Sequence, residues 1–152
     1  MGTAVKRIQS IPWREFEGST RPALVDGDLV VSYAELAERV DARRTELGAG
    51  RKLIRIRFSR DVESVVNYLA ALDAGHAAWL EAPGCELQAS PTPIRPDVEI
   101  SVRDGRAEIV ESGDPGEHLH LDLAVLLSTS GSTGAPRLVR LSHSNVRANA
   151  CA

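Results

Sequence analysis

The sequence predicts an α/β protein in which a partly parallel sheet carries flanking helices and β-hairpins. Three observations support this prediction. Residues 53–80 have the pattern of strand, helix and strand within about 30 residues, which favours parallel pairing of the two strands. Two pairs of short apolar stretches, one on each side of this unit, flank turn sequences typical of hairpins. The composition is also globular, since 43% of the 152 residues are hydrophobic and 26% are charged.

The N-terminal region combines a leader with the first hairpin. Residues 1–20 are predicted to be a leader that contains a short helix at 12–17, because proline is favoured in a first helical turn. The apolar stretches 23–26 and 29–31 then flank Asp26-Gly27-Asp28. This arrangement predicts a hairpin with a tight turn.

A helix is predicted to begin directly after this hairpin, at Ser32. Ser32 and Glu35 have the spacing of a capping box, in which each side chain binds a backbone N–H of the other residue. The apolar residues on one face of this helix are Leu36, Val40 and Leu47. Gly48 and Gly50 are expected to end it.

The central strand–helix–strand unit follows. Residues 53–58 alternate between apolar and polar side chains, which predicts a strand with one buried side. That side consists of Ile54, Ile56 and Phe58. Asp61 is placed to cap the next helix, and Gly75 is placed to end it in a left-handed conformation. The apolar residues of this helix recur at helical spacing: Val62, Val65, Val66, Leu69 and Leu72. Residues 77–80 are predicted to be the second strand.

The chain continues with a long loop, a second hairpin and a further strand. Residues 81–96 contain four prolines, so we expect a loop there. The stretches 98–102 and 106–110 flank Arg103-Asp104-Gly105 and predict the hairpin. An apolar strand is predicted at 121–127, and it leads into a segment rich in hydroxyl groups.

The segment from Ser128 to Arg137 has the composition of a polyphosphate-binding loop. It reads Ser-Thr-Ser-Gly-Ser-Thr-Gly-Ala-Pro-Arg. Its glycines allow backbone N–H groups to approach an anion closely, and its hydroxyls are further donors. Its arginine has a permanent charge in a fork that fits phosphate oxygens. The spacing of glycines in the chain excludes a Walker loop and a dinucleotide fingerprint.

The residues after this loop argue against a phosphate site at a helix N-terminus. Residues 138–141 alternate like a strand, and Pro136 is tolerable only at the start of one. A final helix is expected to follow, with Ser142 or Ser144 as its N-cap.

Residues 130–137, with the Leu-Ser-His-Ser-Asn run at 141–145, resemble the phosphate-binding loop of the adenylate-forming superfamily. This superfamily includes acyl-CoA synthetases, nonribosomal adenylation domains and luciferases. Its motif ends in lysine, where this chain has Arg137. Two weaker matches lie upstream in the expected order, at 31–36 and 72–77. The proline common near the end of the second of these motifs is replaced around Trp79 and Leu80.

Members of this superfamily use ATP to activate a carboxylic acid as an acyl-adenylate, and many then transfer the acyl group to the thiol of coenzyme A or of a carrier protein. The resemblance therefore implies ATP and Mg²⁺ as cofactors of the complete enzyme. It assigns the following residues to phosphate binding: Thr129, Ser130, Gly131, Ser132, Thr133, Gly134 and Arg137. It assigns no catalytic acid, base or nucleophile to this chain, and no metal ligand.

The resemblance implies an incomplete domain. Residues 21–152 correspond to the N-terminal part of the family's large domain, and the family's later motifs lie beyond that part. We therefore expect a piece of an acid–ATP ligase that is inactive alone, binds no cofactor tightly and needs the missing remainder of the domain. The alternative is a non-catalytic binding or assembly module derived from the same fold. Apolar surface that the missing layers would cover also allows self-association.

Charge and cysteine content restrict the other classes of function. The chain has 18 basic and 21 acidic residues, a net charge of −3, so no nucleic-acid-binding surface is predicted. The apolar runs are too short to span a bilayer, and no membrane association is expected. Cys85 and Cys151 do not have the spacing of a disulfide framework, which favours a reduced, cytoplasmic protein.

The remaining candidate residues are histidines. On a strand, His118, His120 and Asp122 would share one face and could hold zinc, although a polar strand face is the simpler interpretation. His76 and His143 are predicted to be structural rather than catalytic. Cys85 has no neighbour in the sequence that would activate it as a nucleophile.

Overall fold

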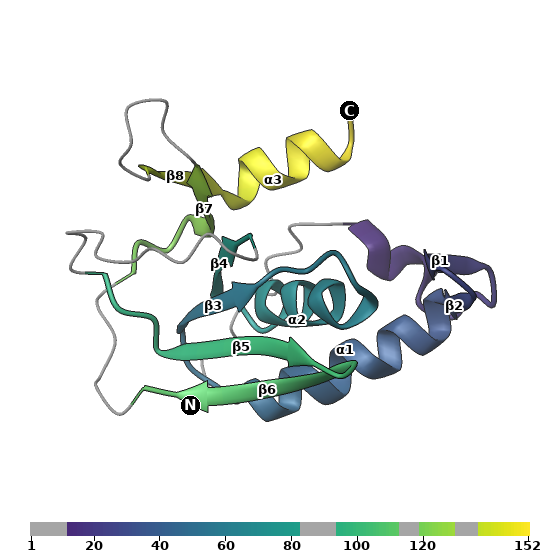
Figure 1. Ribbon diagram of the computed structural model, residues 1–152. Helices are drawn as coiled ribbons and strands as arrows, with labels where there is room; N and C mark the ends of the chain where they lie inside the picture. Colours follow the sequence, from purple (N-terminus) through teal and green to yellow (C-terminus); the bar gives the residue numbers. More distant parts are fainter. Residues whose placement is uncertain (1–11, 83–93, 113–118, 130–136) are drawn as a thin grey trace, which may run out of the picture.

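The computed structural model describes residues 12–82, 94–112, 119–129 and 137–152 (Figure 1). These residues form one two-stranded sheet and one six-stranded sheet with helices packed against them. The elements in chain order are the 3-10 helix η1 (Pro12–Phe16), β1 (Pro22–Asp26), β2 (Leu29–Ser32), α1 (Tyr33–Leu47), β3 (Leu53–Arg57), α2 (Val62–Asp73), β4 (Ala77–Glu81), β5 (Val98–Arg103), β6 (Arg106–Glu111), β7 (Leu123–Thr129), β8 (Arg137–Ser142) and α3 (His143–Ala150).

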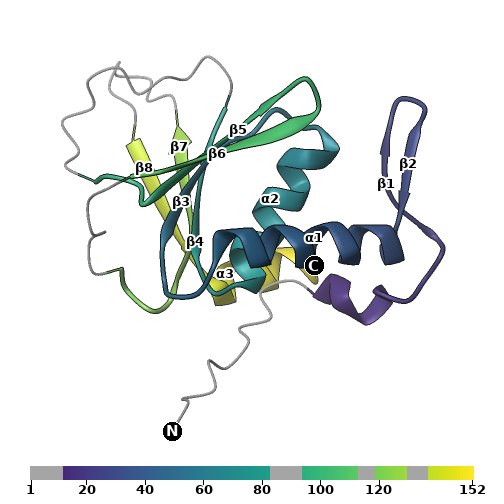
Figure 2. The ribbon, with the colours of Figure 1, turned by 90° about the horizontal axis from the view of Figure 1, so that it is seen from below.

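The larger sheet confirms the predicted α/β class. Its strand order is β6-β5-β3-β4-β7-β8. β3 pairs in parallel with β4 and β5, and β4 pairs in parallel with β7. β6 and β8 are antiparallel strands at the two edges, so the sheet is partly parallel. Helices α1 and α2 lie on the same side of this sheet, and the β1–β2 hairpin stands apart from it (Figure 2).

Local sequence signals define the ends of the helices. Ser32 caps α1 in the predicted capping box: its hydroxyl accepts from the Glu35 N–H at 3.3 Å, and its own N–H donates to the Glu35 carboxylate at 2.8 Å. Of the two residues predicted as possible N-caps of α3, Ser142 is the one observed. It forms the same two reciprocal hydrogen bonds with Asn145 that Ser32 forms with Glu35. Gly75 follows α2 with a φ of 81°, the left-handed conformation predicted for it.

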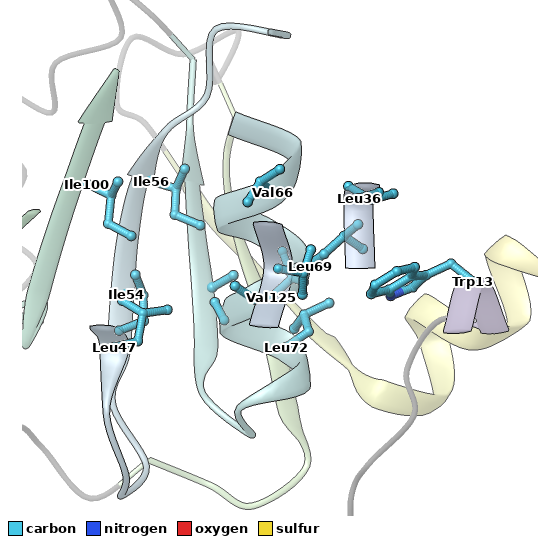
Figure 3. Close-up of a cluster of buried hydrophobic side chains, with 14 of the residues drawn as sticks. Trp13, Leu36, Leu47, Ile54, Ile56, Val66, Leu69, Leu72, Ile100 and Val125 are labelled. Carbon is cyan, nitrogen blue, oxygen red and sulfur yellow. The ribbon is translucent and has the colours of Figure 1, made fainter. Parts of the chain in front are cut away.

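The main core lies between the sheet and the helices α1 and α2 (Figure 3). Ile54 and Ile56 of β3 are fully buried there, together with Val66 of α2. A smaller cluster lies on the opposite face of the sheet. Its buried members are Leu53, Ala77, Trp79 and Leu126. Because both faces are buried, alternate residues of the parallel strands have different surroundings.

The predicted short N-terminal helix is a 3-10 helix, Pro12–Phe16, tied to α1 and α2 by Arg14. Arg14 Nε donates to Asp73 Oδ2 at 2.7 Å, and its Nη2 donates to Asp41 Oδ1 at 2.8 Å. The guanidinium carbon also lies 4.4 Å from the centroid of the Trp13 ring. Burial alone would lower the pKa of Arg14, but the hydrogen bonds and charges of the two aspartates outweigh it and raise the pKa.

Substitutions at Ile56 should show how strongly this core stabilises the fold. Ile56→Val is expected to lower the free energy of unfolding by about 1 kcal/mol and Ile56→Ala by about 3 kcal/mol, because the surroundings only partly fill the cavity. The control is Val110→Ala on β6, where the side chain is 64% exposed and the expected change is within about 0.5 kcal/mol. Urea unfolding monitored by circular dichroism measures all three. Equal losses for Ile56→Ala and Val110→Ala would contradict this assignment of the core.

Candidate functional site

Strands β7 and β8 pair in antiparallel orientation. In the sequence, the hydroxyl-rich loop connects the end of β7 to the start of β8. The last described pair of these strands places the backbone of Thr129 opposite that of Arg137. The other five residues predicted to bind phosphate lie outside the described residues: Ser130, Gly131, Ser132, Thr133 and Gly134. The prediction that a strand rather than a helix follows the loop is confirmed by β8.

The topology determines where this loop starts. β3, β4 and β7 are parallel to one another, so their carboxyl ends lie at the same edge of the sheet. β7 ends at that edge with Thr129, the first of the residues predicted to bind phosphate. Ligands of open α/β sheets bind outside the carboxyl ends of the parallel strands. The position predicted for phosphate binding is thus the edge at which this class of sheet binds its ligands.

A charged cluster, Arg55, Glu81 and Glu99, lies on the face of the sheet opposite α1 and α2. Arg55 is on the central strand β3 and is in register with Glu99 of β5. Its Nη2 lies 3.3 Å from a carboxylate oxygen of Glu99, and its Nε lies 3.6 Å from one of Glu81. The Glu81 side chain is only 3% exposed, and its Oε1 has no hydrogen-bond partner among the described residues.

Trp79 joins the charged cluster to the start of the hydroxyl-rich segment. The guanidinium carbon of Arg55 lies 5.5 Å from the centroid of the indole, within the range of a cation–π contact. On the far side, Trp79 Nε1 donates to the hydroxyl of Ser128 at 3.0 Å. Trp79 itself is 3% exposed. Ser128 is on β7, immediately before the first residue predicted to bind phosphate.

The sequence analysis missed this group of residues. One signal was present: Arg55 and Arg57 interrupt an otherwise apolar strand in the centre of the predicted βαβ unit. On parallel strands whose two faces are both buried, charged residues are rare unless each has a partner of opposite charge. Another signal was Trp79, which stands near the place where the family motif has proline. Neither signal identifies its partners, because Glu99 and Ser128 are far away in the sequence.

The two histidines predicted to be structural are both buried. His76 is fully buried, and its Nδ1 accepts from the Lys52 N–H at 3.3 Å. Burial, with the nearby charge of Lys52, lowers the pKa of His76 to about 4. His143 is the first residue of α3, and burial followed by the charge of Arg51 lowers its pKa. Both rings are therefore neutral near pH 7.

The expected strand face with His118, His120 and Asp122 is wrong in the part that the structure describes. β7 begins at Leu123, and Asp122 lies in a turn before it, in which its N–H donates to His120 Nδ1 at 3.2 Å. The polar turn residues hydrogen-bond locally instead of extending the strand. His118 lies outside the described residues. Among the described residues, no group of three His, Cys, Asp or Glu side chains could hold a metal ion.

Comparison with known proteins connects this arrangement to a family. No family model matches the chain. Bacitracin synthase 1 of Bacillus licheniformis is 30% identical in an alignment 149 residues long, which covers 82% of this chain and 3% of that protein. The NpsA N-terminal subdomain of Klebsiella oxytoca, crystallised with 3-hydroxyanthranilyl-AMSN, has 22% identity and a TM-score of 0.61 over 86% of this chain and 39% of its own.

MatB of Rhodopseudomonas palustris has the same fold. Its apo structure has 19% identity and a TM-score of 0.65, and it covers 93% of this chain and 35% of its own. The ATP-bound structure has 22% identity and a TM-score of 0.58, with 80% and 31% covered. The chain thus spans well under half the length of each of these relatives. At these identities the structural likeness establishes the fold.

The described residues have the fold of the N-terminal portion of an adenylate-forming α/β domain. Together with the sequence similarity to part of bacitracin synthase 1, this fold confirms the predicted resemblance of the chain to the adenylate-forming superfamily. None of the described helices combines the length and the apolar character needed to cross a bilayer.

Replacing Arg55 tests how much this residue stabilises the buried carboxylate of Glu81. Arg55→Met is expected to lower the free energy of unfolding by about 3 kcal/mol, because it leaves a buried carboxylate without its partner. Arg55→Met combined with Glu81→Leu should recover most of that loss, since an apolar pair of similar volume needs no partner charge. Urea unfolding of the three proteins tests this. A double variant no more stable than Arg55→Met would contradict the pairing.

The buried neutral state of His76 makes stability depend on pH. The pKa of His76 is about 4 in the folded chain, against 6.5 for a free histidine. Between these values the unfolded chain binds a proton that the folded chain does not, so stability is present above about pH 6.5 and falls as the pH drops towards 4.

His76→Asn keeps an acceptor for the Lys52 N–H but cannot titrate. The difference in free energy of unfolding between the original chain and this variant should therefore shrink as the pH falls from about 6.5 to 4. Urea unfolding of both proteins at pH values of about 7.5, 6, 5 and 4 measures this difference in stability. A constant difference across this range would show that His76 titrates normally.

Proposed function

We propose that this chain is the phosphate-binding N-terminal part of an ATP-dependent ligase. The complete enzyme would activate a carboxylic acid as its acyl-adenylate and then transfer the acyl group to the thiol of coenzyme A or of a carrier protein. The observation that carries the proposal is that the sequence motif 130–137 directly follows β7, whose carboxyl end lies at the same edge of the sheet as that of β4. The ATP-bound structure of MatB, which shares the fold, supports it.

The proposed contribution of this chain is positioning and charge stabilisation. In the reaction the acid's carboxylate attacks the α-phosphorus of ATP, and pyrophosphate leaves. Backbone N–H groups and hydroxyls of residues 129–134 would hold the β- and γ-phosphates, and Arg137 would neutralise part of the charge that develops on the leaving group. No proton transfer by a side chain of this chain is needed.

Magnesium would be bound mainly by the triphosphate. The described residues offer no group of three carboxylate or histidine side chains for it. We therefore propose that any protein ligand of Mg²⁺ comes from the remainder of the domain. The metal would supply charge neutralisation on the phosphate oxygens. A cytoplasmic location, where ATP is available, fits this proposal.

The decisive experiment is acid-dependent exchange between ATP and pyrophosphate. We expect no exchange by the 152 residues alone, and exchange when the polypeptide that completes the domain is added. Exchange by the chain alone would show that the phosphate loop and the acid site are both present in it. Absence of exchange from the completed domain with every acid tested would favour the alternative, a non-catalytic module.

Arg137 should be the side chain whose loss is most damaging to this exchange. Arg137→Ala is expected to lower the exchange rate of the completed domain about 10- to 100-fold, because a charged hydrogen bond contributes about 1.5–3 kcal/mol. Arg137→Lys, which restores the family's motif, should keep most of the rate. The matched control is Arg140→Ala, an exposed arginine further along β8, which should leave the rate unchanged. Equal losses at both positions would contradict a specific phosphate contact.

A further inference from the structure

A chain of four side chains crosses the sheet and ends at the start of the hydroxyl-rich segment. Glu99 of β5 pairs with Arg55 of β3 at 3.3 Å, and the Arg55 guanidinium lies 5.5 Å from the Trp79 ring of β4. Trp79 Nε1 in turn donates to Ser128 Oγ of β7 at 3.0 Å. Each of four neighbouring strands thus contributes one member.

The indole is held from both sides. It is 3% exposed and belongs to the smaller apolar cluster with Leu126, its neighbour in register on β7. Arg55, which lies against the ring, forms ion pairs with Glu81 and Glu99, although its Nε has no hydrogen-bond partner among the described residues. The position of Nε1 is therefore determined by contacts that do not involve the hydroxyl-rich segment.

The polar end of the indole points to a single described partner. An indole N–H can only donate, so Ser128 Oγ must be the acceptor, and its position is constrained by that of the ring. An apolar residue at position 79 could fill the same space without this constraint. Packing alone therefore does not require this hydrogen bond. The bond is made to Ser128, the last residue of β7 whose side chain is described, just before the segment proposed to bind phosphate.

We propose that Trp79 is a positioning residue for phosphate binding, acting through Ser128. The hydrogen bond holds the Ser128 side chain just before the segment proposed to bind phosphate, and the indole is held by its burial and by its contact with Arg55. This inference rests on the proposed function, because it concerns how the same loop is aligned for the phosphates. Neither Trp79 nor Ser128 is among the residues assigned above to phosphate binding.

The test uses the 152-residue chain and compares Trp79→Phe, Ser128→Ala and the double variant. The control is Trp13→Phe at the other tryptophan, a residue of η1 whose side chain packs in the main core. Ser128→Ala breaks the same hydrogen bond without touching the buried ring, so it decides the question if Trp79→Phe fails to fold. Urea unfolding first establishes that each variant is folded.

The first readout needs no ligand. Backbone amide resonances of residues 130–136, measured by ¹⁵N–¹H correlation spectra, should shift in the same way in Trp79→Phe and Ser128→Ala, and the double variant should add nothing further. Trp13→Phe should leave them unchanged. Unchanged resonances in Trp79→Phe, or shifts unlike those of Ser128→Ala, would overturn the proposal.

The second readout is the dissociation constant of inorganic tripolyphosphate for the completed domain, because the 152 residues alone are expected to bind no cofactor tightly. Each single variant should weaken binding about three- to tenfold, as expected for one neutral hydrogen bond, and the double variant should be no weaker than either. Additive losses would overturn the coupling of Trp79 with Ser128. No binding by the completed original domain would instead count against the proposed function, and the amide shifts would still decide whether Trp79 positions the segment.

Discussion

The parallel register of β3, β4 and β7 is the constraint on which the rest of the structure depends. These strands are buried on both faces, against α1 and α2 on one side and within the smaller apolar cluster on the other. A slip of one residue in β3 would move Arg55 into the main core and Ile56 out of it. Side chains thus fix the register, and the register brings the end of β7 to the edge where β3 and β4 also end.

The parts of the fold that could be predicted from the sequence are those specified by neighbouring residues. The capping pair Ser32 and Glu35 acts over a single helical turn, so its spacing is sufficient evidence for the start of α1. The turn between β5 and β6 is equally local, since Asp104 and Gly105 both have positive φ, 51° and 70°, a conformation that these residue types tolerate. The crossover through α2 was predictable because helix and strands follow one another directly.

The parts that could not be predicted depend on residues far apart in the chain. β5 pairs with β3 rather than with β4, the strand before it, and no local pattern specifies this choice. The pairing of Arg55 with Glu99 follows from that strand order alone. The phosphate-binding prediction depended on two kinds of evidence. The residue types indicated an anion site, whereas ATP as the ligand was implied only by the resemblance to a known family. The central residues of this site, 130–134, lie outside the described residues and remain a prediction.

Stability alone does not account for the charged cluster. Replacing a buried ion pair by apolar residues of similar volume is often neutral or stabilising, so the burial of Glu81 beside the partly buried Arg55 needs another explanation. Apolar packing specifies that a side chain is buried but constrains its direction weakly, whereas hydrogen bonds and ion pairs have preferred geometries. Direction matters most where a strand leads into the segment proposed to bind phosphate, since phosphate oxygens would have to meet several donors at once. The chain from Glu99 through Arg55 and Trp79 to Ser128 ends at that point, and this location gives the buried charges a role that packing cannot replace.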